Sequence, residues 1–207
     1  DKEIVSRLKN TFEIDRLFSD QAELSISLVE HFSSNNKSYK SLAAWSPGQW
    51  KDQIKKAKVI TFPEYVRGDN KEEKLTKYAE LLSNQFRFLF PTNYISGNLA
   101  VEANSPFKKS DELKRFFERN PDYDITATDC IKKFDDSMDK NGFDAITLKQ
   151  NIKSLNRLLK ITDIDYNAIN VLKEAKLDSA ASIARKYGSK SFAKEFSVKL
   201  GNVEHAF

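Results

Sequence analysis

The chain has 207 residues, and 34 Lys and Arg against 30 Asp and Glu give it a net charge of only +4. Charged residues make up 31% of the chain with both signs interspersed, which argues against nucleic acid as a partner, because that would require Lys and Arg gathered on one face. A chain of this length can bury roughly 70% of its unfolded surface, and its 15 Phe, 7 Tyr and 2 Trp supply the large side chains of a core.

The N-terminal part of the chain predicts a series of short amphipathic helices. Their apolar residues recur at helical spacing, and the breaks between them fall on capping residues and prolines. Ser46-Pro47 predicts the start of one helix, because the N–H that proline lacks would have no partner there. His31 is expected at the end of another helix, where a cation favours the helix dipole. The apolar positions of this region are Leu8, Phe12 and Ile14, then Leu42 and Ala43, then Trp50 and Ile54.

The longest helix is predicted over about residues 70–90. Asp69 and Glu72 have the form of a capping box at its start. The aromatic stripe of this helix is typical of a core face rather than of a ligand site. The residues of the stripe are Leu75, Tyr78, Ala79, Leu82, Phe86, Leu89 and Phe90.

Two shorter helices and a connector are predicted around this long helix. The stretch Val59 to Phe62 has some strand character, but Pro63 ends it, so it is interpreted as an extended connector. One short helix is predicted over residues 110–119 and another near residues 128–134. The inward residues of the first are Leu113, Phe116 and Phe117.

The C-terminal stretch predicts four short helices that must hold one another by packing, because isolated helices of this length are marginal in water. Asp163 or Asp165 can cap the second helix, and Asp178 can cap the third. Gly188 is expected to end the third helix in a left-handed backbone conformation, and Gly201 to end the fourth. The apolar faces are Ile152, Leu155 and Leu159; Ile164, Ala168, Leu172 and Ala175; Ala180, Ile183, Ala184 and Tyr187; and Phe192, Phe196 and Leu200.

The N-terminal and C-terminal patterns can be laid over each other, although chance similarity between amphipathic helices is the other explanation. We therefore expect an all-α fold, a multi-helix orthogonal or repeat-like bundle of short helices with an extended connector. It would form one domain over residues 1–207, or two closely packed lobes, with diverged units at about 8–57 and 148–201 and connecting helices at about 58–147. The matched residues are Leu8, Phe12 and Ile14 with Leu155, Leu159 and Ile161; Leu42-Ala43 with Ile183-Ala184; and Trp50 and Ile54 with Phe192 and Phe196.

One polar loop has part of the pattern of a calcium site. Ser137 to Gly142 places oxygen donors at the first, third and fifth positions and glycine at the sixth. The apolar position 8 is Asp144, and position 12, which should supply a bidentate glutamate, is Leu148. A turn rich in Asp and Asn is the ordinary explanation, and no metal site is predicted.

The remaining candidates for chemistry are few. Neither His31 nor His205 lies in a metal-ligand spacing. Cys130 with a distant histidine is the one conceivable nucleophile pair of a small hydrolase, but a lone cysteine on a short helix is usually a small apolar filler. Adjacent carboxylates such as Asp135-Asp136 and Glu72-Glu73 do not share a helix face. We therefore expect no enzyme, no catalytic, cofactor-binding or metal-binding residue, and no cofactor.

The single cysteine excludes an internal disulfide. No apolar run approaches the roughly 18 residues of a membrane span, and no signal peptide is visible. Because the chain opens at Asp1 and its sole methionine is Met138, we expect it to be a piece of a longer polypeptide, with any targeting segment outside it.

Several blocks of residues keep a fixed order over roughly residues 40–204. They are Phe62-Pro63, Val66, Gly68, Glu72-Glu73-Lys74, Tyr78-Ala79 and Phe90-Pro91-Thr92; Phe117, Asn120-Pro121 and Tyr123-Asp124; LNRLLKIT at 155–162; AKLDSA at 175–180 with Ile183-Ala184; and Phe192, Phe196 and Leu200-Gly201. In this order they resemble a helical segment of the A subunits of bacterial insecticidal toxin complexes, the Tc toxins. Each block alone consists of helix caps and core positions, and their joint order carries the resemblance.

The sequence departs from the family pattern at three places. Arg67 stands where the family usually has proline, Lys176 replaces the glycine before Leu177, and only one glycine follows Leu200. The change from glycine to Lys176 suggests that a tight turn between two helices is made differently here.

The resemblance implies a non-catalytic segment of the α-helical shell of a large A subunit that is secreted or lies on the bacterial cell surface. Such virulence proteins assemble as pentamers, bind target cells and form the channel that translocates a toxic enzyme, and the channel helices and the enzyme lie elsewhere. The implied partners are other segments of the same large chain, neighbouring subunits of the homo-oligomer, and a host cell-surface receptor or glycan, with no nucleic acid and no membrane span in this segment. The alternative is a helical-repeat protein-binding or adaptor module unrelated to toxins.

Overall fold

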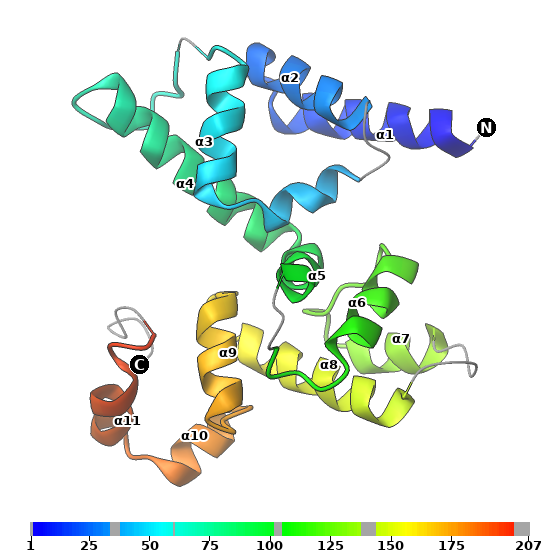
Figure 1. The fold of residues 1–207 in the computed structure, drawn as a ribbon, viewed down its shortest axis with the longest axis vertical. Coiled ribbons are helices and arrows are strands. Elements are labelled where there is room, and N and C mark those ends of the chain that lie inside the picture. The colour runs from blue at the N-terminus through cyan, green and yellow to red at the C-terminus, as the bar shows by residue number, and fades with distance from the viewer. Residues whose placement is uncertain (1, 34–37, 60, 102–104, 138–143, 201–207) are drawn as a thin grey trace. The chain divides into compact units, whose positions relative to one another are not determined.

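The computed structural model describes residues 2–33, 38–59, 61–101, 105–137 and 144–200. Eleven α-helices and one 3-10 helix lie in these residues, and no strand occurs among them, so the predicted all-α fold is confirmed (Figure 1). Val59, Thr61 and Phe62 lie outside any helix, as expected of a connector. The chain divides into two compact units, residues 1–94 and 95–207, and one of the two predicted repeat-like segments falls in each unit.

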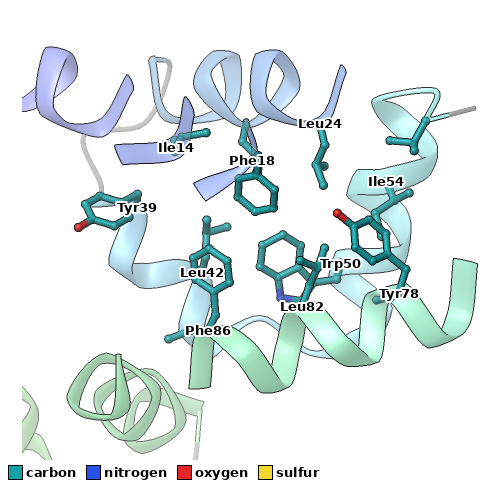
Figure 2. Close-up of a cluster of buried hydrophobic side chains, with 14 of the residues drawn as sticks. Ile14, Phe18, Leu24, Tyr39, Leu42, Trp50, Ile54, Tyr78, Leu82 and Phe86 are labelled. Carbon is teal, nitrogen blue, oxygen red and sulfur yellow. The ribbon is translucent and has the colours of Figure 1, made fainter. Parts of the chain in front are cut away.

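The first unit is built around a buried tryptophan. It contains α1 (Lys2–Leu17), α2 (Ala22–Ser33), the 3-10 helix η1 (Tyr39–Ala44), α3 (Pro47–Lys56) and α4 (Lys71–Leu89). Helix α3 starts at Ser46-Pro47 as predicted, and Ser46 and Gln49 form a reciprocal capping box there. Trp50 of α3 is 0% exposed and packs against both Phe18 and Phe86, whose ring centroids are 6.2 and 5.1 Å from its own (Figure 2). The core residues predicted in α4 are buried except at its end, where Leu89 is exposed and Phe90 is half-buried.

The second unit is built around α8. Helix α5 (Pro91–Val101) crosses the boundary between the units in the sequence, and it is followed by α6 (Ser110–Arg119), α7 (Cys130–Ser137), α8 (Ala145–Leu159), α9 (Tyr166–Glu174), α10 (Ala180–Lys186) and α11 (Ser189–Phe196). Helix α8 contacts α6, α7 and α9. Its predicted apolar residues are buried, as are those predicted in α6. Helix α11 ends earlier than predicted, so Leu200 lies beyond it, and Gly201 lies outside the described residues.

Helix α4 begins one residue later than its predicted capping box. Asn70 is the N-cap residue, and its Oδ1 accepts a hydrogen bond from the Glu73 N–H at 2.9 Å. Glu73 Oε2 in turn accepts from the Asp69 N–H at 2.9 Å. The N-cap bond is therefore made one residue later than predicted, and the Glu73 carboxylate binds the N–H of the residue before the N-cap instead of closing a reciprocal capping box.

The caps of α9 and α10 correct two further predictions. Asp165 caps α9 by accepting from the Ala168 N–H at 2.9 Å, which confirms one of its two predicted caps. Ile164 was expected on the apolar face of this helix, but it precedes the helix with a φ of 60°. Helix α10 is capped by Ser179 rather than by Asp178, because the serine hydroxyl accepts from a backbone N–H of the first turn.

The C-terminus of α9 forms a Schellman motif with a lysine at the position that usually holds glycine. The Leu177 N–H bonds to the Leu172 carbonyl at 2.8 Å, and the Lys176 N–H bonds to the Lys173 carbonyl at 3.0 Å. Lys176 has a φ of 59°, in the left-handed region. Lys176 therefore takes the left-handed conformation that glycine usually supplies at the end of a helix. The expectation that the turn differs from that of the toxin family stays a prediction.

The same motif ends α3. Lys58 has a φ of 55°, and its N–H bonds to the Lys55 carbonyl at 3.0 Å. Gly188, which was predicted to end α10 in the left-handed conformation, has a φ of −76° and is the N-cap of α11. That prediction was wrong. The residues that end α3 and α9 in the left-handed conformation are both lysines.

The burial pattern favours a different register for the first helix of the predicted repeat. Leu8 and Phe12 are exposed, whereas their predicted counterparts Leu155 and Leu159 are buried. A separation of 141 residues, the one predicted for Leu42 with Ile183, instead pairs buried residues with buried residues along α1 and α8. These pairs are Asn10 with Asn151, Ile14 with Leu155, and Phe18 with Leu159.

Candidate interaction surface

Helix α1 presents an apolar face to solvent. Ile4, Leu8 and Phe12 follow one another at intervals of four residues and Val5 lies beside them, so all four share one side of the helix. Their exposed fractions are 57% for Ile4, 52% for Leu8, 71% for Phe12 and 65% for Val5. Contiguous exposed apolar side chains of this kind mark interaction sites more often than isolated ones do. These four residues are termed the α1 stripe.

The opposite side of α1 anchors the helix in the core. Ile14 is 0% exposed, and the Phe18 ring, just past the helix, stacks on Phe86 with centroids 5.9 Å apart. Asn10 Oδ1 accepts a hydrogen bond from the Tyr39 N–H at 3.2 Å, which ties α1 to the start of η1. The helix is therefore held by its inner side, and the α1 stripe contributes nothing to the core of the unit.

The surroundings of the α1 stripe are polar and shallow. Arg16 donates to Glu13 Oε2 at 2.8 Å, and this bond raises the pKa of Arg16. The depression between α1 and α2 is open to solvent and too shallow to enclose a small molecule. The surface therefore fits another helix better than a small ligand. The depression is lined by Arg7, Asn10, Thr11, Val29, Phe32 and Ser33.

Cys130 and His31 occupy structural positions. Cys130 is 2% exposed at the start of α7, where burial raises the pKa of its thiol. Its backbone carbonyl accepts a hydrogen bond from the Tyr123 hydroxyl at 2.8 Å. His31 lies in the last turn of α2, as predicted, and its ring meets that of Trp45 edge to face at 5.3 Å. The structure places Cys130 and His31 in different units, and His205 lies outside the described residues.

The loop with part of a calcium pattern is described only at its ends. Residues 138–143 lie outside the described residues. Asp144 caps α8, with its two carboxylate oxygens accepting from the N–H and the hydroxyl of Thr147 at 3.1 and 2.8 Å. Leu148 is 0% exposed in the core. The described end of the loop therefore serves the start of a helix.

The adjacent carboxylates pair separately with lysines. Glu72 lies 2.7 Å from Lys51, and Glu73 lies 2.6 Å from Lys77. Hydrogen bonds from these lysines lower the pKa values of both carboxyl groups. Asp135 pairs with a lysine of α8 at 2.6 Å. Glu72, Glu73 and Asp135 thus each have a cationic partner on a helix surface, which is the ordinary arrangement of a solvated exterior.

One polar contact in the second unit has no signal in the sequence. Lys173 of α9 donates to Ser154 Oγ of α8 at 2.9 Å, and its ammonium lies 5.4 Å from the centroid of the Phe107 ring. Burial lowers the pKa of Lys173. Serine–lysine pairs act as nucleophile and base in some hydrolases, but Ser154 is 1% exposed, so a substrate cannot reach its hydroxyl in this conformation.

Two features were sought across the part of the chain that the structure describes. No group of three or more His, Cys, Asp or Glu side chains there could hold a metal ion. None of the helices described has both the length and the apolar character needed to cross a membrane.

Comparison with known proteins leaves the function to be argued from the residues of this chain. The resemblance to Tc toxin A subunits rests on the sequence blocks described above and stays a prediction. No family model, no curated protein and no solved structure matches the chain.

Proposed function

We propose that the chain is a non-catalytic segment of the helical shell of a large A subunit of the Tc toxin type, a pentameric, cell-binding component that translocates a toxic enzyme. The observation that supports this proposal best is the exposed α1 stripe. In the assembly, the stripe would be one of the contacts through which the segment packs against another helix. On this proposal the parent protein acts outside the bacterial cytoplasm, as a secreted or cell-surface virulence factor.

The size of the α1 stripe supports a helix-to-helix contact within a larger interface. Its exposed fractions together amount to about two and a half fully exposed side chains, each worth roughly 1.5–3 kcal/mol on burial. A stable interface usually buries about 800 Å² on each partner, or roughly 20–30 residues. Four residues are fewer than this, so the α1 stripe would be one part of a more extensive contact, as in a shell whose segments are held by many neighbours.

In two of the blocks that carry the resemblance, the structure gives a physical explanation for one residue. Lys176, which stands where the family has glycine, takes the left-handed conformation that glycine adopts without strain. A Cβ on Gly68 would lie 3.0 Å from the Lys74 backbone nitrogen, so the loop before α4 favours a glycine at this point. These residues support the idea that the two blocks mark the same helix ends here as in the toxin family.

The experiment is to measure the mass of the assembly formed by the native polypeptide that contains this chain, by light scattering. We expect a very large chain in a five-fold particle. The double variant Leu8→Gln with Phe12→Gln is expected to weaken the assembly while leaving the helical circular dichroism unchanged. The matched control is Leu81→Gln with Phe88→Gln, which removes two exposed apolar side chains of α4 (44% and 52% exposed) and should assemble normally.

Two outcomes would overturn the proposal. One is a small monomeric polypeptide, which would favour the helical adaptor module. The other is a large particle whose stability is the same with and without the substitutions at Leu8 and Phe12, which would remove the α1 stripe from the interface.

A further inference from the structure

The net charge of the chain is concentrated in one segment. Residues 176–200 contain six Lys and Arg but only two acidic residues, so this stretch has a net charge of +4, equal to that of the whole chain. The rest of the chain is therefore balanced, and the low overall charge conceals the asymmetry. The six basic side chains, all exposed, are Lys176, Arg185, Lys186, Lys190, Lys194 and Lys199, and they are termed the basic segment.

Some lysines elsewhere in the described chain pair with carboxylates, but those of the basic segment do not. Lys51, Lys77 and Lys149, for example, each lie within 2.7 Å of a carboxylate oxygen. None of the six side chains of the basic segment forms an ion pair with a carboxylate among the described residues. Of the two nearby acids, Glu195 accepts from the Tyr187 hydroxyl at 3.2 Å. The positive charge of the segment is therefore largely uncompensated.

Helix α11 directs its lysines away from its aromatic side. Lys190 and Lys194 lie four residues apart and share one side of the helix. Phe192 and Phe196, on the opposite side, are 4% and 1% exposed and stack with centroids 4.8 Å apart. Val198, just past the helix, is 93% exposed. The end of this helix thus combines lysines with an exposed apolar side chain.

The composition of the basic segment distinguishes among anionic partners. Five of its six cations are lysines, which act as point charges, whereas arginine is preferred for bidentate binding of a defined phosphate or carboxylate. Clusters of four to eight basic residues are typical of binding to anionic lipid headgroups, and the six here are spread over α10, α11 and the residues that flank them. An apolar side chain among lysines adds the shallow insertion that interfacial helices use.

We propose that the basic segment binds α10 and α11 to the surface of a membrane that contains anionic lipids. The contact is peripheral and depends on charge. It goes beyond the proposed shell function and does not rest on it, because it requires neither the α1 stripe nor an oligomer.

The test is sedimentation of the whole chain with vesicles of phosphatidylcholine containing 30% phosphatidylserine, against vesicles of phosphatidylcholine alone. We expect binding only to the anionic vesicles, and its loss in about 0.5 M salt because exposed charges are then screened. Each lysine near an anionic surface contributes about 1 kcal/mol, so the double variant Lys190→Glu with Lys194→Glu should bind at least about 25-fold more weakly.

A matched control separates the local effect from that of net charge. Lys56→Glu with Lys132→Glu makes the same change in total charge at exposed lysines outside the basic segment and should bind normally. The proposal fails if the anionic vesicles do not bind the chain, or if the control loses as much affinity as the variant at Lys190 and Lys194. Binding to polyglutamate without binding to vesicles would also overturn it, in favour of an acidic protein partner. None of these three outcomes affects the shell function, which is judged by the mass of the assembly.

Discussion

Replacing Lys176 by glycine is expected to stabilise the chain. A residue with a Cβ in the left-handed conformation costs roughly 1–2 kcal/mol, and Lys176 is held there by the two hydrogen bonds that end α9. Glycine removes this cost, but it lowers the free energy of unfolding by about 0.5–1 kcal/mol because it loses more conformational freedom on folding. The exposed lysine has no ion pair among the described residues to lose. The net gain is therefore about 0.5–1 kcal/mol.

The gain is measurable by urea or thermal unfolding followed by circular dichroism. For a chain of this size 1 kcal/mol shifts the melting temperature by roughly 2–4 °C, so Lys176→Gly should raise it by about 1–4 °C. The control is Lys153→Gly, at an exposed position inside α8, which should destabilise the chain by about 1 kcal/mol. A Lys176→Gly variant that is as stable as the parent or less stable, beside a control that behaves as expected, would refute the strain assigned to this turn.

Three further predictions concern the two cores. Trp50→Ala should cost about 3–5 kcal/mol in urea unfolding, because the buried indole packs against both Phe18 and Phe86; a change below 1 kcal/mol would contradict this packing. Cys130 should react with a thiol reagent only in urea, since it is buried and its pKa is raised; rapid labelling of the folded chain would show that the thiol is accessible. Burial also raises the pKa of Tyr123 in the folded chain. The stability that the neutral phenol contributes is therefore complete below its pKa in the unfolded chain, near 10, and is lost as the pH rises from there toward its pKa in the folded chain. Tyr123→Phe should therefore lose less stability than the parent between about pH 9 and 11, and equal losses would assign the effect to other groups.

The sequence predicted which residues of α4 face the core, but not which side of α1 does. In α4 the apolar residues from Leu75 to Phe86 form one stripe, so the core face follows from helical spacing alone. Helix α1 has apolar residues on two sides, and spacing cannot tell which side meets the rest of the unit. Leu8 and Phe12 were matched to Leu155 and Leu159 on spacing alone. The side that is buried, with Ile14 and Phe18, is set by contacts with the distant Trp50 and Phe86.

The helix ends show a similar limit. A helix that ends in the left-handed conformation usually has glycine there. The sequence therefore indicated Gly188 as such an end, and it did not indicate Lys176 or Lys58. At α9 the conformation is enforced by burial of Leu177, which is 1% exposed, after the turn. A packing requirement beyond the helix therefore overrides the local preference of lysine.

The surfaces were visible in the sequence only in part. The basic segment could have been found by counting charge in windows, because the average over the whole chain hides it. The contact of Lys173 with Ser154 joins two helices across 19 residues, and no local pattern indicates which polar side chains will meet in this way.

The two apolar sides of α1 also decide how the helix would change under selection. A polar residue at Ile14 disturbs the core, whereas one at Leu8 or Phe12 leaves the core intact and makes the isolated chain more soluble. Directed evolution for solubility alone should therefore replace Leu8 and Phe12 within a few rounds. Selection for a function that buries the outer side should retain them. Whether these two positions change during selection therefore shows whether the outer side of the helix is buried in function.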